Sequence, residues 1–154
     1  MRQIRNETVE KMEELMPLIQ ESLMAGKSVR FFPHGISMLP MLRQGIDSVV
    51  ISPLPETLKK YDLPLYRRDD GAYVLHRIVE TGETFTCMGD NQFTRESGVR
   101  RDQMIALVTA FYRGEKYHSV EETGYRLYCR FRHYSRPLRH FYRREIGWLR
   151  RKLK

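Results

Sequence analysis

The sequence predicts a mainly β protein of the α+β class, in which a curled β domain follows one helix and precedes a basic helical tail. Three observations predict this arrangement. Apolar residues recur at helical spacing near both ends, short apolar runs alternate with turn residues between them, and positive charge collects at the C-terminal end. We therefore expect an N-terminal helix within residues 1–25, a β domain over residues 26–120 and a helical tail over residues 121–154.

The first helix is expected within "NETVEKMEELMPLIQESLMAGKS", residues 6–28. Asn6 or Thr8 would cap its N-terminus, and Gly26 would end it. Pro17 is expected to kink or split the helix, because a proline inside a helix removes one backbone hydrogen bond. The apolar face of this helix consists of Val9, Met12, Met16, Ile19 and Leu23.

Short strands separated by turns are expected in the middle of the chain. They are "SVRFF" (28–32), "SVVIS" (48–52), "LPLYRR" (63–68), "AYVLHRIVE" (72–80), "TFTCM" (84–88) and "MIALVTAFYRG" (104–114). The polar segment "GDNQFTRESG", residues 89–98, is expected to be a loop. Six or so strands in about ninety residues predict a compact, curled β domain.

The tail carries the positive charge of the protein. Residues 125–154 hold nine Arg, two Lys and one Glu, a net charge of +10, whereas the rest of the chain has a net charge of −2. We expect two helical pieces parted at Pro137. In the second piece, one face holds Leu138, Tyr142, Ile146, Leu149 and Leu153, while Arg139, Arg143, Arg144, Arg150 and Arg151 lie mostly off it. With Trp148 beside that face, the pattern is typical of a basic amphipathic helix at a membrane surface or in a partner groove. It is equally typical of a helix that packs on its own domain.

The composition excludes several classes of protein. With 154 residues, 41% apolar and 30% charged, the chain has the composition of one folded domain. No apolar run approaches the ~20 residues of a transmembrane helix, and the N-terminus has no apolar core of a secretory signal. The expected location is the cytoplasm, with membrane association through the tail left open. Cys87 and Cys129 have no metal-type spacing and are expected to be free thiols, so no metal or organic cofactor is predicted.

Ser37 is the first candidate for chemistry. It lies in "FFPHGISMLPML", where Gly35 allows a tight turn and Pro40 restricts the preceding residue. A serine in such a stiff segment can simply close a turn. It can also be a nucleophile if a base elsewhere in the chain comes within reach.

His76 is the candidate base. It lies in "YVLHRIV", on the expected strand face of Val74 and Ile78, where a histidine is either a satisfied core residue or a catalyst. The other histidines are His34, which would reach Ser37 only if the chain folds back, and His118, His133 and His140 in the basic end. A carboxylate must orient such a base, and Asp90 and Glu96 in the polar segment are both candidates.

Together these motifs resemble the signal peptidase I / LexA-like serine peptidase superfamily over about residues 26–114. "GISMLPML" is similar to the box around the catalytic serine, and "GIDSVVISP" to the Gly-Asp strand that follows, with one residue inserted. "CMGDN" is similar to the Gly-Asp-Asn box and "QMIALVTAFYR" to the closing strand. The His-Arg pair in "LHRIV" resembles the histidine-type branch, found in archaeal and endoplasmic-reticulum signal peptidases.

The resemblance implies a serine endopeptidase that cleaves a precursor or leader peptide, with Ser37 as nucleophile and His76 as general base. Asp90 and Glu96 both remain open as the residue that orients His76. The resemblance also implies a LexA/signal-peptidase-like β domain and a substrate bound as an extended strand. Gly35 stands where lysine-type relatives often place a hydroxyl, so backbone N–H groups would have to stabilise the oxyanion.

Two alternatives accompany this hypothesis. The chain is either a catalytically weak or inactive binding module that uses its basic tail on a membrane or nucleic acid, or a LexA-like self-cleaving regulator cut at Ala25–Gly26. The expected partners are a peptide or protein substrate and, as an option, a membrane surface contacted through residues 125–154. Nucleic acid is the less favoured partner, and the oligomeric state is left open.

Overall fold

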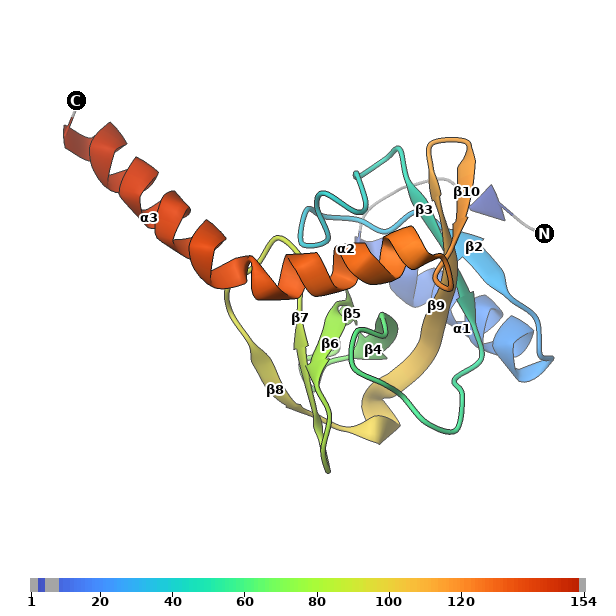
Figure 1. Cartoon of the computed structure of the whole chain (residues 1–154). Coiled ribbons are helices and arrows are strands. Elements are labelled where there is room, and N and C mark those ends of the chain that lie inside the picture. Colours follow the sequence, from blue (N-terminus) through green and yellow to red (C-terminus); the bar gives the residue numbers. More distant parts are fainter. Residues whose placement is uncertain (1–2, 5–8, 153–154) are drawn as a thin grey trace.

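The computed structural model describes the backbone of residues 3–4 and 9–152 and the side-chain environments of residues 12–146 (Figure 1). The elements, in chain order, are β1 (Gln3–Ile4), α1 (Val9–Met24), β2 (Val29–Phe31), β3 (Ser48–Ser52), β4 (Pro64–Arg67), β5 (Tyr73–Leu75), β6 (Arg77–Glu80), β7 (Phe85–Met88), β8 (Glu96–Val99), a 3-10 turn (Arg101–Gln103), β9 (Met104–Arg113), β10 (Lys116–Ser119), α2 (Thr123–Tyr134) and α3 (Arg136–Lys152).

The strands form two sheets, and their pairing confirms the α+β class. In the described part of the chain, a seven-stranded sheet has the order β1-β2-β3-β9-β4-β5, with β10 also paired to β9, and a three-stranded sheet has the order β6-β7-β8. Only β1 and β2 pair in parallel within these described residues. His76 is the single residue between β5 and β6, so the chain passes from one sheet to the other at this histidine.

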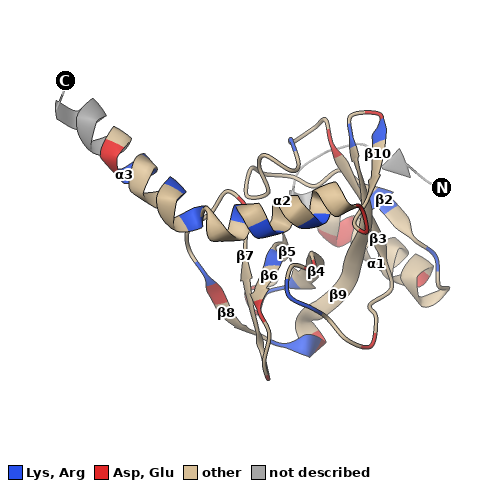
Figure 2. Ribbon diagram, viewed as in Figure 1, with Lys and Arg blue, Asp and Glu red and all other residues tan. Residues whose placement is uncertain are grey.

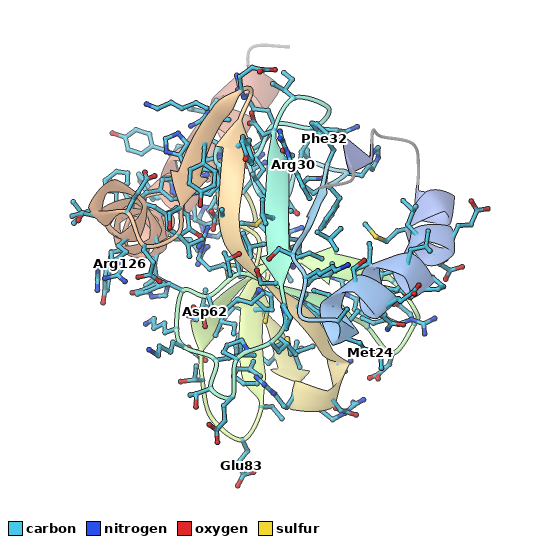
Figure 3. All side chains as sticks on the ribbon, turned by 90° about the vertical axis from the view of Figure 1, so that its right-hand side faces the viewer. Met24, Arg30, Phe32, Asp62, Glu83 and Arg126 are labelled. Carbon is cyan, nitrogen blue, oxygen red and sulfur yellow. The ribbon has the colours of Figure 1, made fainter. Side chains whose placement is uncertain are left out.

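Helices α1 and α2 cover opposite sides of the larger sheet (Figures 1 and 3). Met16, Ile19 and Leu23 of α1 are buried in one cluster with Val49 and Val108 of the sheet, and aromatic side chains of α2 pack against the same cluster. Each such side chain, once fully buried, contributes about 1.5–3 kcal/mol of hydrophobic free energy. A second apolar cluster joins strands of the two sheets, from β4 and β5 to β6 and β7.

Helix α1 has the apolar face predicted from its spacing. Met12 packs against the core beside the three buried residues, whereas the side chain of Val9 and the expected caps Asn6 and Thr8 lie outside the described residues. Gly26, at φ +72°, ends the helix: its N–H donates to Leu23 O, and Lys27 N–H donates to Ser22 O. The expectation that Pro17 splits the helix is wrong, because α1 runs unbroken through it with Pro17 on the exposed side.

Several strands differ from the prediction. The expected continuous strand over residues 72–80 is broken at His76, because its two halves pair with different partners, β4 and β7. The expected loop over residues 89–98 contains the start of β8, which pairs with β7. Strands β1 and β10 were not predicted, since each is a short edge strand without a strong apolar pattern. The segment over residues 48–52 forms β3 as expected.

The tail forms two helices that part at Ser135, not at Pro137. Pro137 lies in the first turn of α3. Backbone N–H groups in a first turn have no acceptor within the helix, so the N–H that proline lacks costs the helix no hydrogen bond. Helix α2 lies across the body, whereas α3 extends away from it (Figure 1). The side chains of Trp148, Leu149, Arg150, Arg151 and Leu153 lie outside the described residues. Within the described part of the chain, we find no helix with the length and apolarity that a membrane span requires.

Candidate active site

Ser37 and His76 line the same cavity, which has a volume of about 230 Å³. Ser37 lies in the loop between β2 and β3, and His76 lies at the junction of the two sheets. The same cavity is lined by Pro33, His34, Gly35, Met38, Leu42, Arg68, Tyr73, Val74, Leu75 and Gln92. Among the described side chains, no hydrogen bond joins Ser37 to His76 directly. The structure therefore brings the candidate nucleophile and the candidate base to one cavity without a hydrogen bond between them.

The Gly-Asp-Asn turn holds the Ser37 loop in place. Asn91 N–H donates to Ser37 O at 2.8 Å, and the Asn91 side-chain amide donates to Ile36 O at 3.2 Å. A Cβ atom on Gly89 would lie 2.6 Å from Ser37 O, closer than side-chain carbons approach a backbone oxygen. Glycine at this position therefore permits the close approach of the two loops, and the turn fixes the backbone on which Ser37 is carried.

His76 is buried, with 5% of its surface exposed, and its Nδ1 faces two oxygen atoms. Nδ1 lies 3.6 Å from Glu96 Oε2 and 3.5 Å from the hydroxyl oxygen of Tyr66. Tyr66 donates its own proton to Glu96 Oε2 at 2.7 Å, so towards His76 it can act only as an acceptor. Both neighbours therefore favour a proton on Nδ1, which leaves Nε2 as the ring nitrogen with a free lone pair.

Burial determines the charge of His76. Removal from water lowers the pKa of His76 to about 4, and the nearby Glu96 carboxylate opposes this shift only in part. Burial alone would raise the pKa of Glu96, but the hydrogen bonds from Arg68 and Tyr66 lower it overall. Arg68 binds both carboxylate oxygens of Glu96, at 2.6 and 2.8 Å. At neutral pH the site thus holds a neutral imidazole, able to accept a proton, beside an ionised carboxylate.

Asp90, the other candidate acid, has different partners. It is fully buried and receives two hydrogen bonds of 2.8 Å from Arg77 and a third of 2.8 Å from the Tyr128 hydroxyl. Burial would raise the pKa of Asp90, but the charge and hydrogen bonds of Arg77 hold it below its usual value. Of the two candidates left open by the sequence, Glu96 lies against His76, whereas Asp90 lies in a separate ion pair.

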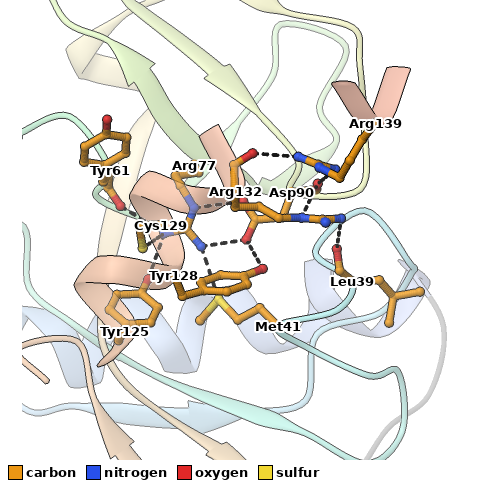
Figure 4. Close-up of polar contacts among 10 residues, drawn as sticks. All are labelled: Leu39, Met41, Tyr61, Arg77, Asp90, Tyr125, Tyr128, Cys129, Arg132 and Arg139. Atoms are coloured by element: carbon orange, nitrogen blue, oxygen red, sulfur yellow. Dashed lines mark hydrogen bonds and ion pairs between the residues drawn. The ribbon is translucent and has the colours of Figure 1, made fainter. Parts of the chain in front are cut away.

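The ion pair is the centre of a buried polar group that we call the Arg77 cluster: Arg77, Asp90, Tyr125, Tyr128 and Cys129 (Figure 4). Arg77 donates to the Tyr125 hydroxyl at 2.8 Å and to Cys129 Sγ at 3.0 Å, both on α2. It also donates to Tyr61 O at 3.1 Å. Helix α2 is thus joined to the β domain through the residue that follows His76.

Two arginines of the tail continue this connection. Arg132 donates to Asp90 O at 3.1 Å and to Leu39 O at 3.3 Å, so it bridges the Gly-Asp-Asn turn and the Ser37 loop (Figure 4). Arg139 donates to Asp90 O at 3.4 Å and to Arg132 O at 2.6 Å. The inner face of the tail helices therefore supports both loops that carry the candidate site.

The remaining histidines are placed less favourably for base catalysis. His34 lines the cavity but is exposed, and His118 pairs with Glu122 at 3.0 Å. His133 contacts the ring of Tyr61, and His140 contacts that of Phe93. Among the residues that the structure describes, no group of three or more His, Cys, Asp or Glu side chains is arranged to hold a metal ion.

Tyr66 and Arg68, which hold Glu96, were not predicted as site residues from the sequence. Their spacing in the sequence could have indicated them. Residues two positions apart in an extended chain point to the same side, and the strand that contains Tyr66 pairs with the strand that precedes His76. We compared the chain with models of protein families, with curated proteins and with solved structures, and found no match. The functional interpretation therefore rests on the cavity, the neutral imidazole and its carboxylate.

Proposed function

We propose that this chain is a serine endopeptidase of the histidine type, with the curled β domain of the signal peptidase / LexA-like superfamily. Ser37 is the nucleophile, His76 the general base, and Glu96 the carboxylate that orients His76. The observation that carries this proposal is that Ser37 and a buried, neutral His76 line one cavity, with the Glu96 carboxylate 3.6 Å from Nδ1 of the imidazole.

In the proposed reaction, Ser37 Oγ attacks the peptide carbonyl while His76 Nε2 removes its proton. The imidazolium that forms lies 3.6 Å from the Glu96 carboxylate, whose charge stabilises it. His76 then protonates the leaving amine, and an acyl group remains on Ser37. Water activated by the regenerated imidazole hydrolyses this ester and restores the enzyme.

Backbone N–H groups are the proposed donors to the oxyanion. The N–H of Gly35 is already bonded to the Gln44 side chain at 3.1 Å. In the described part of the chain, the N–H groups of Ser37 and Met38 have no acceptor among the hydrogen bonds that we find, and these two are the donors that we propose for the oxyanion. Such donors typically contribute about 10²–10³ in rate each.

Strand β5 supports the proposal of an extended peptide substrate. It lies at the end of the larger sheet, paired on one side with β4, and Tyr73 and Leu75 both line the cavity. An extended segment of a precursor or leader peptide can add to this edge through main-chain hydrogen bonds. The apolar residues Met38 and Leu42 would then contact the side chains beside the cut bond.

The test is cleavage of a complex peptide library, read by mass spectrometry. We expect the wild-type chain and the control variant Ser22→Ala to produce the same new termini, because Ser22 lies on α1 and does not line the cavity. Ser37→Ala and His76→Ala should lose roughly 10³-fold or more of this activity. Glu96→Gln should fold like the wild type and lose activity. The library peptides whose cleavage depends on Ser37 identify the substrate.

The alternatives predict different products. A library left intact by the wild-type chain would contradict the peptidase proposal and favour a binding module without catalysis. A Ser37-dependent loss of the first 25 residues from the chain itself would favour self-cleavage. In the structure, Ala25 and Gly26 form the turn directly after α1, with their N–H groups donating to Glu21 O and Leu23 O, so this segment is not extended as a peptidase substrate has to be.

A further inference from the structure

The outer face of the tail helices carries a row of large apolar side chains, which we call the tail stripe. Each is between 48% and 71% exposed, and they are Leu127, Phe131, Tyr134, Leu138, Phe141, Tyr142 and Ile146. Their spacing, which is three or four residues except for the adjacent pair Phe141 and Tyr142, places them along one side of α2 and α3. Single exposed apolar residues are common on protein surfaces, but a row of this length, broken in α3 by Glu145, marks an interaction site.

Within the described part of the chain, the side chains of the tail stripe stay exposed, and only the Tyr134 hydroxyl contacts the body, at the side chain of Tyr61. The opposite side of α2 is already occupied, since Tyr125, Tyr128 and Cys129 take part in the Arg77 cluster and Arg132 binds the two loops. Turning the stripe inward would break these contacts. Helix α3 extends away from the body (Figure 1), and its described stripe residues, Leu138, Phe141, Tyr142 and Ile146, remain 48–61% exposed.

Positive charge accompanies the stripe. Arg126, Arg130 and Arg144 are exposed and, by helical spacing, lie along one edge of it. Figure 2 shows Lys and Arg distributed along both helices, and Glu145 is the only acidic residue of α2 and α3. An apolar row with a basic edge matches a surface that is apolar inside and negatively charged outside.

We propose that the tail stripe binds the surface of an anionic lipid bilayer, with α3 lying in the plane of the interface. The apolar side chains would enter the boundary between headgroups and acyl chains, and the arginines would pair with lipid phosphates. A second copy of this chain fits less well, because two tails of net charge +10 would repel each other. Nucleic acid would pair with the arginines but would leave Leu127, Leu138 and Ile146 in water.

The test is sedimentation of the full chain with vesicles, and it does not depend on peptidase activity. We expect binding to vesicles of phosphatidylcholine with about one-third phosphatidylglycerol, and weaker binding to phosphatidylcholine alone. Raising the salt concentration from about 0.1 M to about 0.5 M should weaken binding to the anionic vesicles without abolishing it, because salt screens charges and leaves apolar burial intact. Each of Phe131→Ser and Leu138→Ser should lower the partition coefficient roughly tenfold.

Matched variants separate the contributions. Leu18→Ser on α1 removes an apolar side chain that is 49% exposed and lies outside the stripe, and it should leave vesicle binding unchanged. Arg130→Gln and Arg144→Gln should each weaken binding to the anionic vesicles roughly fivefold and leave the low affinity for neutral vesicles as it is. Far-UV circular dichroism and the urea midpoint establish that each variant is folded.

Three results would overturn the proposal. The first is no binding of the wild-type chain to anionic vesicles. The second is stripe variants that bind as tightly as the wild type. The third is a chain that binds a single-stranded oligonucleotide and not the vesicles, with the arginine variants alone reducing that binding.

Discussion

Asp90→Ala tests how strongly the Arg77 cluster joins the tail to the β domain. The side chain of Arg77 is 2% exposed and that of Asp90 is fully buried, and two hydrogen bonds of 2.8 Å join them. Removing the carboxylate leaves a buried guanidinium without its counter-charge. It also leaves the Tyr128 hydroxyl without its acceptor.

The expected loss of stability follows from these contacts. Breaking a buried ion pair by removing one partner typically costs about 3–5 kcal/mol, and an unsatisfied hydroxyl costs about 1–3 kcal/mol more. The Tyr125 hydroxyl and the Tyr61 carbonyl still bind Arg77, which offsets part of this loss. We therefore expect a decrease of about 4 kcal/mol in the free energy of unfolding, a large share of the ~5–15 kcal/mol typical of a domain.

The assay is urea unfolding of the full chain followed by far-UV circular dichroism. With a slope of about 2 kcal/mol per molar urea, the midpoint should fall by about 2 M. Asp69→Ala is the matched control, because Asp69 also pairs with an arginine, Arg100, but the two side chains are 78% and 50% exposed. That variant should lose at most about 1 kcal/mol. A loss below about 1 kcal/mol for Asp90→Ala, or equal losses for both variants, would refute the reasoning.

Four further predictions concern the site and the first helix. Gly89→Ala should lower peptide cleavage about 10²-fold, because the new Cβ would lie 2.6 Å from Ser37 O. The Ser37 loop would have to move by about 0.8 Å to restore an ordinary contact distance. An unchanged turnover would contradict this. The imidazole of His76, followed by NMR, should titrate near pH 4, and a midpoint near 6.5 would contradict its burial. As the pH falls, the imidazole of His76 is protonated in the unfolded chain before it is protonated in the folded one, so the free energy of unfolding should decrease between about pH 6.5 and about pH 4. His76→Gln should lack this part of the decrease. Equal pH dependence of the unfolding free energy in the wild type and in His76→Gln would refute this. Gly26→Ala, at φ +72°, should cost about 1 kcal/mol in unfolding free energy, whereas Ala25→Ser beside it should cost less.

Local patterns predicted the elements that depend on neighbours in sequence. The apolar face of α1, its end at Gly26 and the strand β3 were all predicted from spacing and turn chemistry. They follow from the sequence because helix periodicity and a glycine with positive φ act within a few residues. The break at His76 could not be predicted this way, since it depends on two strands that pair elsewhere in the chain.

The same limit applies to the candidate site. The sequence offered Asp90 and Glu96 equally as partners of His76, six residues apart in one polar segment. The structure separates them, because Arg77 and Tyr128 engage Asp90, whereas Tyr66 and Arg68 hold Glu96 against the imidazole.

By itself the sequence determined the residue types available for chemistry, the helical and strand periods, and the concentration of positive charge in the tail. Only the tertiary structure decided that Ser37 and His76 line one cavity, which carboxylate faces His76, and which side of the tail remains exposed. The physical reason is that these outcomes depend on burial and on hydrogen bonds between residues far apart in the chain, and no local pattern encodes such pairings.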